Sequence, residues 1–273
     1  MAEQMRPIRF IHISDTHLGA GVDYRLSGVH THDGAANLLQ QVRELPFTPD
    51  FIVHTGDIFS GRPPAASDAA IDLFRALPAP VFFVAGNHDD AESLAALPSG
   101  FAEPLPGGAA ARASTWSVRG HRFLSLNLQV EDPESAEGEV TPHQLALVDT
   151  LLSSGDEPWS VFVHFPLLTV DCPWIDREML AREGLALHRV LARYAPRIHG
   201  VFGGHIHRAM QIHRDGVLYC TAASSAVQFH AYPGDESPLM DLEAQPGFNI
   251  VTIVPGQTIV KSMTFNRPAQ VRA

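Results

Sequence analysis

Five short polar clusters in the sequence contain the residue types that bind metal ions. The clusters are Asp-Thr-His at 15–17, Gly-Asp at 56–57, Gly-Asn-His-Asp at 86–89, a single histidine at 164 and Gly-His-Ile-His at 204–207. Imidazole nitrogens and carboxylate or amide oxygens are ligands that manganese, iron and zinc accept. A carboxylate can bridge two such ions, and a pair roughly 3.5–4 Å apart can stabilise the attacking and leaving oxygens in a displacement at phosphorus. Each cluster alone is compatible with an ordinary turn, but all five together predict a two-metal centre that hydrolyses phosphate esters.

An apolar run precedes each cluster, and these runs must bring the clusters together. The runs are 8–13, 51–53, 81–84, 159–163 and 198–202. Their β-branched and aromatic residues predict buried strands. In layered α/β proteins, ligands bind where the carboxyl ends of strands open into loops. Residues i and i+2 of a strand point to the same side, so Asp15 and His17 can face one centre, as can His205 and His207.

The rest of the pattern predicts helices, strands and loops within one domain that spans 1–273. Helices are expected at 33–42 with Asp33 as N-cap, 67–77, 90–97, 142–152 with Thr141 as N-cap, and about 176–194. A loop is expected at 104–113, and strands at 114–118 and 122–127. Beyond His207, the segments 209–214, 217–221, 248–254 and 258–264 predict an antiparallel meander.

Composition and charge restrict the class of protein and its partners. Of the 273 residues 45% are hydrophobic and 18% charged, which is typical of a globular protein with a substantial core. The net charge is −11 and Lys261 is the only lysine, so a nucleic-acid polymer is not expected as a partner. No apolar stretch reaches the roughly 18 residues that cross a membrane, and the N-terminus lacks a signal-like apolar core, so we expect a cytoplasmic location without membrane contact. Cys172 and Cys220 are expected to be free thiols.

The motifs D-x-H, G-D, G-N-H-D/E, H and G-H-x-H, in this order between Ile11 and His207, resemble those of the calcineurin-like metallophosphoesterases. The resemblance implies an α/β fold, a four-layer α/β/β/α sandwich of two mixed sheets flanked by helices, with 208–273 as a β-rich completion of the second sheet. It also implies two divalent or trivalent metal ions. One would be held by Asp15, His17, Asp57 and His207, and the other by Asp57, Asn87, His164 and His205. Asp57 would bridge the pair, and His88 would face the phosphate and assist the leaving group.

Further segments resemble one branch of that family, the bacterial class III cyclic-nucleotide phosphodiesterases. These segments are 26–31, 172–176, 224–229 and 246–248. This second resemblance implies hydrolysis of a small anionic phosphodiester, 3′,5′-cyclic AMP before others, to a nucleoside 5′-monophosphate by attack of a metal-bridging hydroxide. The chain departs from the pattern at two positions. Ser60 stands where many relatives have an Asp that pairs with the motif histidine, and Asn127 stands where the branch tends to have Asp.

Several alternatives stay open on the sequence. A glycerophosphodiester, a 2′,3′-cyclic nucleotide or a phosphomonoester can undergo the same chemistry. A DNA repair nuclease and a non-catalytic metal-dependent scaffold are less favoured, because the chain is acidic and retains every ligand position. The donor set suits manganese, iron and zinc alike, and we predict manganese or iron first with zinc as the alternative. The apolar region 227–232 can pack within the domain or against a second subunit of a homodimer.

Overall fold

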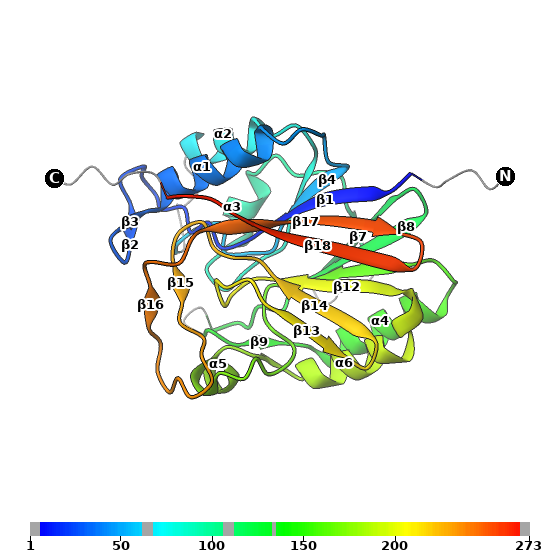
Figure 1. Ribbon diagram of the computed structural model, residues 1–273. Coiled ribbons are helices and arrows are strands. Elements are labelled where there is room, and N and C mark those ends of the chain that lie inside the picture. Colours follow the sequence, from blue (N-terminus) through cyan, green and yellow to red (C-terminus); the bar gives the residue numbers. More distant parts are fainter. Residues whose placement is uncertain (1–5, 62–67, 106–111, 133–134, 268–273) are drawn as a thin grey trace.

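Two mixed β-sheets pack face to face between two layers of helices (Figure 1). The computed structural model describes residues 6–61, 68–105, 112–132 and 135–267. The first sheet has the strand order β18-β17-β1-β4-β5, and the second has the order β13-β14-β12-β10-β8-β7-β6. The predicted four-layer α/β/β/α sandwich is therefore confirmed.

The first sheet is parallel at its centre and antiparallel at one side. Strand β1 (Ile8–Ile13) pairs in parallel with β4 (Phe51–His54), which pairs in parallel with β5 (Val81–Phe83). On the other side of β1, strands β17 (Gly247–Val254) and β18 (Gln257–Thr264) add an antiparallel hairpin. The carboxyl ends of β1, β4 and β5 therefore meet at one edge of this sheet.

The second sheet has the same plan. Its parallel strands are β8 (His121–Leu126), β10 (Trp159–Phe162), β12 (Ile198–Gly203) and β14 (Val217–Thr221). Its antiparallel strands are β6 (Glu103–Pro104), β7 (Ala113–Val118) and β13 (Gln211–Arg214). The described residues also form three two-stranded sheets. They pair β2 (Arg25–Leu26) with β3 (Val29–His30), β9 (Gly138–Glu139) with β11 (Ala181–Arg182), and β15 (Gln228–Phe229) with β16 (Met240–Asp241).

The helices cover the outer faces of the two sheets. On the first sheet lie α1 (Thr31–Arg43), α2 (Asp68–Arg75) and α3 (Ala91–Ala95), and on the second lie α4 (Pro142–Ser153) and α6 (Gly184–Arg193), followed by a 3₁₀ turn (Ala195–Arg197) (Figure 1). The short helix α5 (Pro173–Glu178) lies beyond the ends of the strands (Figure 1). Helix α4 begins as predicted. The Thr141 hydroxyl accepts from the Gln144 amide (3.2 Å), and the Gln144 side chain accepts from the Thr141 amide (3.1 Å), which is a capping box.

Aromatic rings fill the space between the sheets. Phe10 and Phe51 stack with their ring centroids 4.9 Å apart, and Phe162 and Phe202 meet Phe10 edge-on at 5.6 and 5.2 Å. All four side chains are at most 1% exposed. Truncation of such a ring to alanine costs about 3–5 kcal/mol. This layer therefore holds the two sheets, and the strand ends that they carry, in a set relation to each other.

Three predictions of secondary structure are wrong. Helix α1 begins at Thr31 after His30, so Asp33 is not its N-cap but lies in the first turn, where its charge complements the helix dipole. The long helix at 176–194 is two helices separated by β11. Glu183 adopts a left-handed backbone (φ 58°), which a continuous α-helix does not allow. A Cβ at Gly184 would lie 2.6 Å from the carbonyl oxygen of Leu167, so glycine is needed where α6 begins.

The third wrong prediction is the single antiparallel meander after His207. Strands β13 and β14 form a hairpin in the second sheet, whereas β17 and β18 form a hairpin beside β1 in the first. The described part of the predicted segment 208–273, residues 208–267, therefore contributes to both sheets and does not complete the second alone. The backbone groups along the free side of β1 need partners when buried, and β17 supplies them.

The remaining predictions agree with the structure where it describes the chain. The strands 114–118 and 122–127 correspond to β7 and β8, and the helix at 90–97 is the shorter α3, capped by Asp90. Position 67 of the predicted helix 67–77 and positions 106–111 of the predicted loop lie outside the described residues. Cys172 and Cys220 are free and buried, as expected. No helix in the described parts of the chain is long and apolar enough to cross a membrane.

Candidate metal centre

The five polar clusters lie at the carboxyl ends of β1, β4, β5, β10 and β12, where the two sheets meet. Backbone hydrogen bonds continue beyond the strands and join the loops. The amides of Asp15 and His17 donate to the carbonyl groups of Gly56 and Asp57 (both 3.0 Å), and the amide of Gly204 donates to His164 (3.0 Å). The sheets therefore deliver clusters from distant parts of the chain to one place.

Within the described parts of the chain, two groups of side chains have the geometry to hold a metal ion. The first comprises Asp15, His17, Asp57 and His207, and the second comprises Asp57, His164 and His205, with the donor atoms of each group within 4.8 Å of one another. All six residues are at most 4% exposed. Asp57 belongs to both groups, and its Oδ2 lies 3.6 Å from His17 Nε2 and 3.3 Å from His164 Nε2. A carboxylate in this position can bridge two ions.

Hydrogen bonds at the outer ring nitrogens turn three histidines toward the centre. His207 Nδ1 contacts the carbonyl of Val227 (2.9 Å), His164 Nδ1 that of Thr55 (2.7 Å), and His205 Nε2 that of Ala136 (2.7 Å). A carbonyl accepts, so these nitrogens carry the proton. In the neutral rings the other nitrogen then presents its lone pair inward, which is the arrangement seen in metal-binding histidines.

The backbone at these residues is strained. Five of the six adopt a left-handed conformation that non-glycine residues rarely use: Asp15 (φ 54°), His17 (47°), Asp57 (52°), His205 (71°) and His207 (54°). Such strain costs of order 1–3 kcal/mol per residue and tends to occur at functional sites. Here it lets the chain turn at each strand end while the side chains stay directed at a common point.

Electrostatics keep most of the imidazoles neutral. Burial lowers the pKa of His17 and His205 well below the usual range and that of His207 to about 4. For His164, burial alone would lower the pKa, but the Asp57 charge and hydrogen bond raise it to about 9. Burial would raise the pKa of Asp57, yet His164 holds it well below its usual range. At neutral pH the centre therefore presents a carboxylate at Asp57 and three neutral imidazoles.

Asn87 and His88 lie beside these groups and line the same pocket, whose volume is about 490 Å³. The Asn87 Oδ1 atom is buried and has no hydrogen-bond partner among the residues that the structure describes. The backbone amide of His88 donates to Asp57 Oδ1 (2.9 Å), and the His88 ring lies 5.2 Å from the His17 ring. An unpartnered buried amide oxygen next to a carboxylate and imidazoles is a donor that a cation would satisfy. Six of the eight site residues predicted from the sequence therefore line this pocket, and the other two, Asp15 and His164, belong to the two groups of donors beside it.

Three of the segments that resemble the phosphodiesterase branch contribute to the walls of the pocket. Leu26 comes from β2, Trp174 and Met179 from α5 and its end, and Phe229 from β15. The Phe229 ring stacks on His207 with a centroid distance of 4.7 Å and meets Trp174 edge-on at 5.1 Å. These aromatic surfaces lie directly beside the polar centre and can accept a flat apolar group.

Two supporting contacts were not predicted from the sequence. The Tyr24 hydroxyl donates to Ser60 Oγ (3.2 Å), which lies 3.4 Å from His17 Nδ1. Ser60, at the position where many relatives have Asp, thus contacts a histidine of the centre. Ser224 Oγ donates to the carbonyl of Asp15 (2.7 Å), which ties the segment 224–229 to the first cluster. The Ser-rich composition of that segment was the only available signal.

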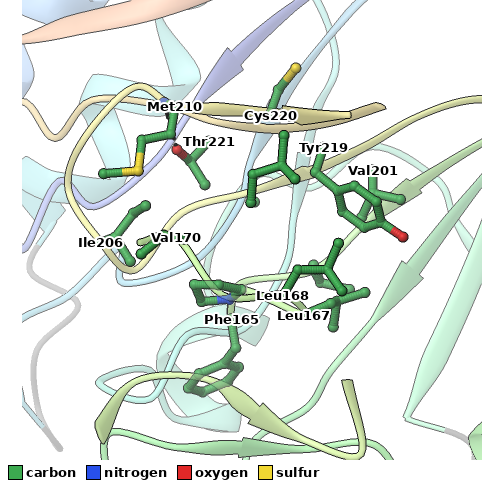
Figure 2. A pocket seen from close by; sticks show the side chains of 14 residues that line it. Phe165, Leu167, Leu168, Val170, Val201, Ile206, Met210, Tyr219, Cys220 and Thr221 are labelled. Atoms are coloured by element: carbon green, nitrogen blue, oxygen red, sulfur yellow. Dashed lines mark hydrogen bonds between the residues drawn. The ribbon is translucent and has the colours of Figure 1, made fainter. Parts of the chain in front are cut away.

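A second cavity behind the centre carries no such chemistry. It measures about 30 Å³, and side chains such as Phe165, Leu168, Ile206 and Met210 surround it (Figure 2). Tyr219 and Thr221 bring polar atoms to its edge, but the lining is otherwise apolar. A space of this size holds about one water molecule, so the reacting groups are in the larger pocket.

Comparison with known proteins supports this description. The model of the calcineurin-like phosphoesterase family matches residues 8–209. A 3′,5′-cyclic-nucleotide phosphodiesterase of Nostoc sp. is 27% identical over 248 residues, which cover 90% of this chain and 88% of that protein. The 3′,5′-cyclic adenosine monophosphate phosphodiesterase CpdA of Escherichia coli is 26% identical over 250 residues, which cover 91% and 83%. A dimetal phosphatase from Danio rerio shares the fold, with a TM-score of 0.65 and 17% identity over 95% of this chain and 99% of that one.

Proposed function

Because the chain belongs to the calcineurin-like phosphoesterase family, and is thus a metal-dependent phosphoester hydrolase, we propose that its substrate is a 3′,5′-cyclic nucleotide, with cyclic AMP first. The product would be the nucleoside 5′-monophosphate. The observation that carries the proposal is Asp57, shared by two groups of metal-binding side chains at the floor of a pocket with aromatic walls.

The donor set fits a pair of metal ions. Asp15, His17, Asp57 and His207 would hold one ion, and Asp57, Asn87, His164 and His205 would hold the other. The fit rests on the inward ring nitrogens and on the unpartnered oxygen of Asn87. Bound there, the pair would lower the pKa of a water molecule and neutralise charge on the phosphate. Imidazole, carboxylate and amide donors suit manganese, iron and zinc alike, and we propose manganese or iron first, with zinc as the alternative.

His88 has two roles beside the metal ions: its backbone amide holds Asp57, and its ring faces the substrate. Asp57 is anchored by the His88 amide at Oδ1, which leaves Oδ2 directed at His17 and His164. The His88 ring lies at the mouth of the centre, where one of its nitrogens would donate a hydrogen bond to the departing alkoxide oxygen. General acid assistance of this kind contributes typically 10²- to about 10⁴-fold.

The aromatic wall supports a nucleotide as substrate. Phe229 and Trp174 flank the polar centre, and a purine ring can lie against such surfaces while the phosphate reaches the metals. Two relatives that match along most of this chain carry names of cyclic-nucleotide phosphodiesterases. Glycerophosphodiesters offer no base to this wall, and 2′,3′-cyclic nucleotides and phosphomonoesters are ranked second because both of these relatives are named for 3′,5′-cyclic substrates. The cytoplasmic location and the homodimer stay predictions.

The test is a substrate panel combined with metal analysis. Purified protein would be analysed for manganese, iron and zinc, and kcat/KM would be measured for cyclic AMP, 2′,3′-cyclic AMP, glycerophosphocholine and a phosphomonoester. We expect two ions per chain and the highest kcat/KM for cyclic AMP. A higher value for glycerophosphocholine would assign the second candidate function, and activity that persists without metal would contradict the two-metal chemistry.

A further inference from the structure

The turn that carries Asn87 and His88 is closed by its own residues. Its first and last members are Gly86 and Asp89. The Asp89 amide donates to the Gly86 carbonyl (3.2 Å), and the Gly86 amide donates to Asp89 Oδ2 (2.9 Å). Asn87 and His88 occupy the two central positions. The direction in which both side chains leave the turn therefore depends on how the Gly86 and Asp89 peptide groups are held.

The side chain of Gln129 forms hydrogen bonds with both ends of this turn. Gln129 follows β8 in the second sheet, whereas the turn follows β5 in the first. Its Nε2 donates to the carbonyl of Gly86 (2.5 Å) and to that of Asp89 (2.7 Å). A single amide thus spans the turn and uses both of its N–H groups. A half-buried side-chain amide whose two N–H groups are each matched to a carbonyl group is held in one orientation.

Asn127 sets the orientation of that amide. The Asn127 Nδ2 donates to Gln129 Oε1 (3.0 Å), and the Gln129 backbone amide donates to Asn127 Oδ1 (2.8 Å). The first of these bonds requires an N–H donor at position 127. An Asp there, as in the branch that the sequence resembles, has no such donor when ionised. Asn127, where the branch tends to have Asp, therefore supplies the donor that the Gln129 side chain needs.

We propose that Asn127 and Gln129 form a positioning pair that fixes the turn and thereby aims Asn87 at one metal position and His88 at the leaving group. The inference rests on the proposed function for the role of His88, but the contacts of the pair with the turn do not depend on it. Partners that orient ligands in this way typically contribute roughly 10- to 100-fold to metal affinity or activity.

Gln129→Met tests the pair because it keeps the size of the side chain and removes both donors. Two substrates are compared at saturating metal: cyclic AMP, whose alkoxide leaving group needs assistance, and bis(4-nitrophenyl) phosphate, whose nitrophenolate needs little. We expect kcat for cyclic AMP to fall roughly 10- to 100-fold and kcat for the nitrophenyl ester to fall no more than a few-fold. Asn127→Asp should show a smaller difference of the same kind between the two falls of kcat. This variant replaces Gln129→Met in the test if Gln129→Met fails to fold.

A second readout does not use activity. Mn²⁺ titration followed by electron paramagnetic resonance should show that the weaker of two ions dissociates roughly 10-fold more easily from Gln129→Met than from wild type. The control is Thr258→Val in β18. It also removes a hydrogen bond from a side chain to a carbonyl group, because Thr258 Oγ1 donates to the carbonyl of His199 (2.7 Å). It should leave the ratio of the two kcat values and the Mn²⁺ affinity unchanged.

The outcomes separate the two proposals. Equal falls of kcat on both esters together with wild-type Mn²⁺ affinity would overturn the positioning role. A wild-type protein that hydrolyses neither ester would overturn the proposed function instead. The Mn²⁺ titration of Gln129→Met then decides the positioning role by itself, since weakened binding supports it and unchanged binding overturns it.

Discussion

His17 Nε2 and His207 Nε2 lie 2.9 Å apart, although 190 positions of sequence separate the two residues. The pKa of each ring is lowered, so both are neutral at pH 7. His207 Nδ1 is occupied by a carbonyl group, which leaves the lone pair of its Nε2 facing His17. Two ring nitrogens this close need a proton or a cation between them. The contact thus links the first and last polar clusters and makes the fold itself sensitive to metal.

Removal of metal should lower the stability of the protein. An ion that binds only the folded state stabilises it by about 2.7 kcal/mol at a concentration of 100 times Kd. We expect EDTA to lower Tm, by roughly 2–4 °C for each kcal/mol lost, and added Mn²⁺ to restore it. Ca²⁺ should not restore it, because it prefers oxygen ligands over imidazole. A Tm that is the same with and without EDTA would contradict the metal centre.

Asp57→Asn should abolish most of the activity. The substitution keeps the shape of the side chain but removes the charge that both groups share. Loss of several kcal/mol of charge stabilisation corresponds to a fall in kcat of roughly 10³-fold. Elemental analysis should find fewer than two ions per chain. Asp50→Asn is the control, since Asp50 pairs with Arg119 away from the centre and its loss should spare metal and rate. Wild-type turnover by Asp57→Asn would refute the ligand assignment.

His88→Ala should keep the metals and lose rate. The His88 ring belongs to neither group of metal-binding side chains, so the metal content should equal that of wild type. Turnover of cyclic AMP should fall roughly 10²- to 10⁴-fold. His143, which is exposed on α4, offers the matched substitution His143→Ala with no expected effect. If His88→Ala loses an ion instead, His88 is a ligand and its assignment to the leaving group is incorrect.

Metal binding should release protons and tighten as pH rises. In the metal-free protein, burial alone would lower the pKa of His164, but Asp57 raises it to about 9, so its Nε2 is protonated at pH 7. The ion must displace that proton, so affinity should increase from pH 6.5 up to about pH 9. Calorimetry at pH 7 in buffers of different ionisation enthalpy should detect the released proton. Identical heats in all buffers would rule it out.

The same shift predicts how stability of the metal-free protein depends on pH. The folded-state pKa of His164 lies above the unfolded value of 6.5. Its contribution is therefore fully present below pH 6.5 and disappears as pH rises through about 9. Urea unfolding of the metal-free protein at pH 6.5 and 9 should show this loss, and it should diminish in His164→Gln. Equal pH dependence in both proteins would show that another group is responsible.

Thr16→Val should destabilise the fold beside the centre. Thr16 Oγ1 donates to the carbonyl of Ile58 (3.0 Å) and lies 3.0 Å from His54 Nε2, which therefore donates to it. Valine leaves the buried His54 donor without its partner, at a cost of about 1–3 kcal/mol. The free energy of unfolding in urea measures this. Thr150→Val, on an exposed face of α4, should change it by much less, and an equal effect of both variants would contradict this account.

Prediction from the sequence succeeded where the pattern is local. The run 8–13 became strand β1 with the same bounds, and the Thr141-Pro142 signal marked the start of α4. It failed where distant contacts decided the outcome. The helix expected at 176–194 is interrupted where β11 pairs with β9, and the expected meander is divided because β17 pairs with β1. Periodicity reports which face of an element is apolar, but not which element will cover it.

The sequence by itself determined which residues can bind metal and that each of them follows a strand. Asp, Asn and His after five apolar runs suffice to predict metal chemistry at one edge of a layered fold. Only the tertiary structure decided that Ser60 contacts His17 and that Gln129 holds the turn of Asn87 and His88. The physical reason is that each of these relations joins loops from different strands. Their separation depends on how two sheets pack, and packing is a property of the whole core.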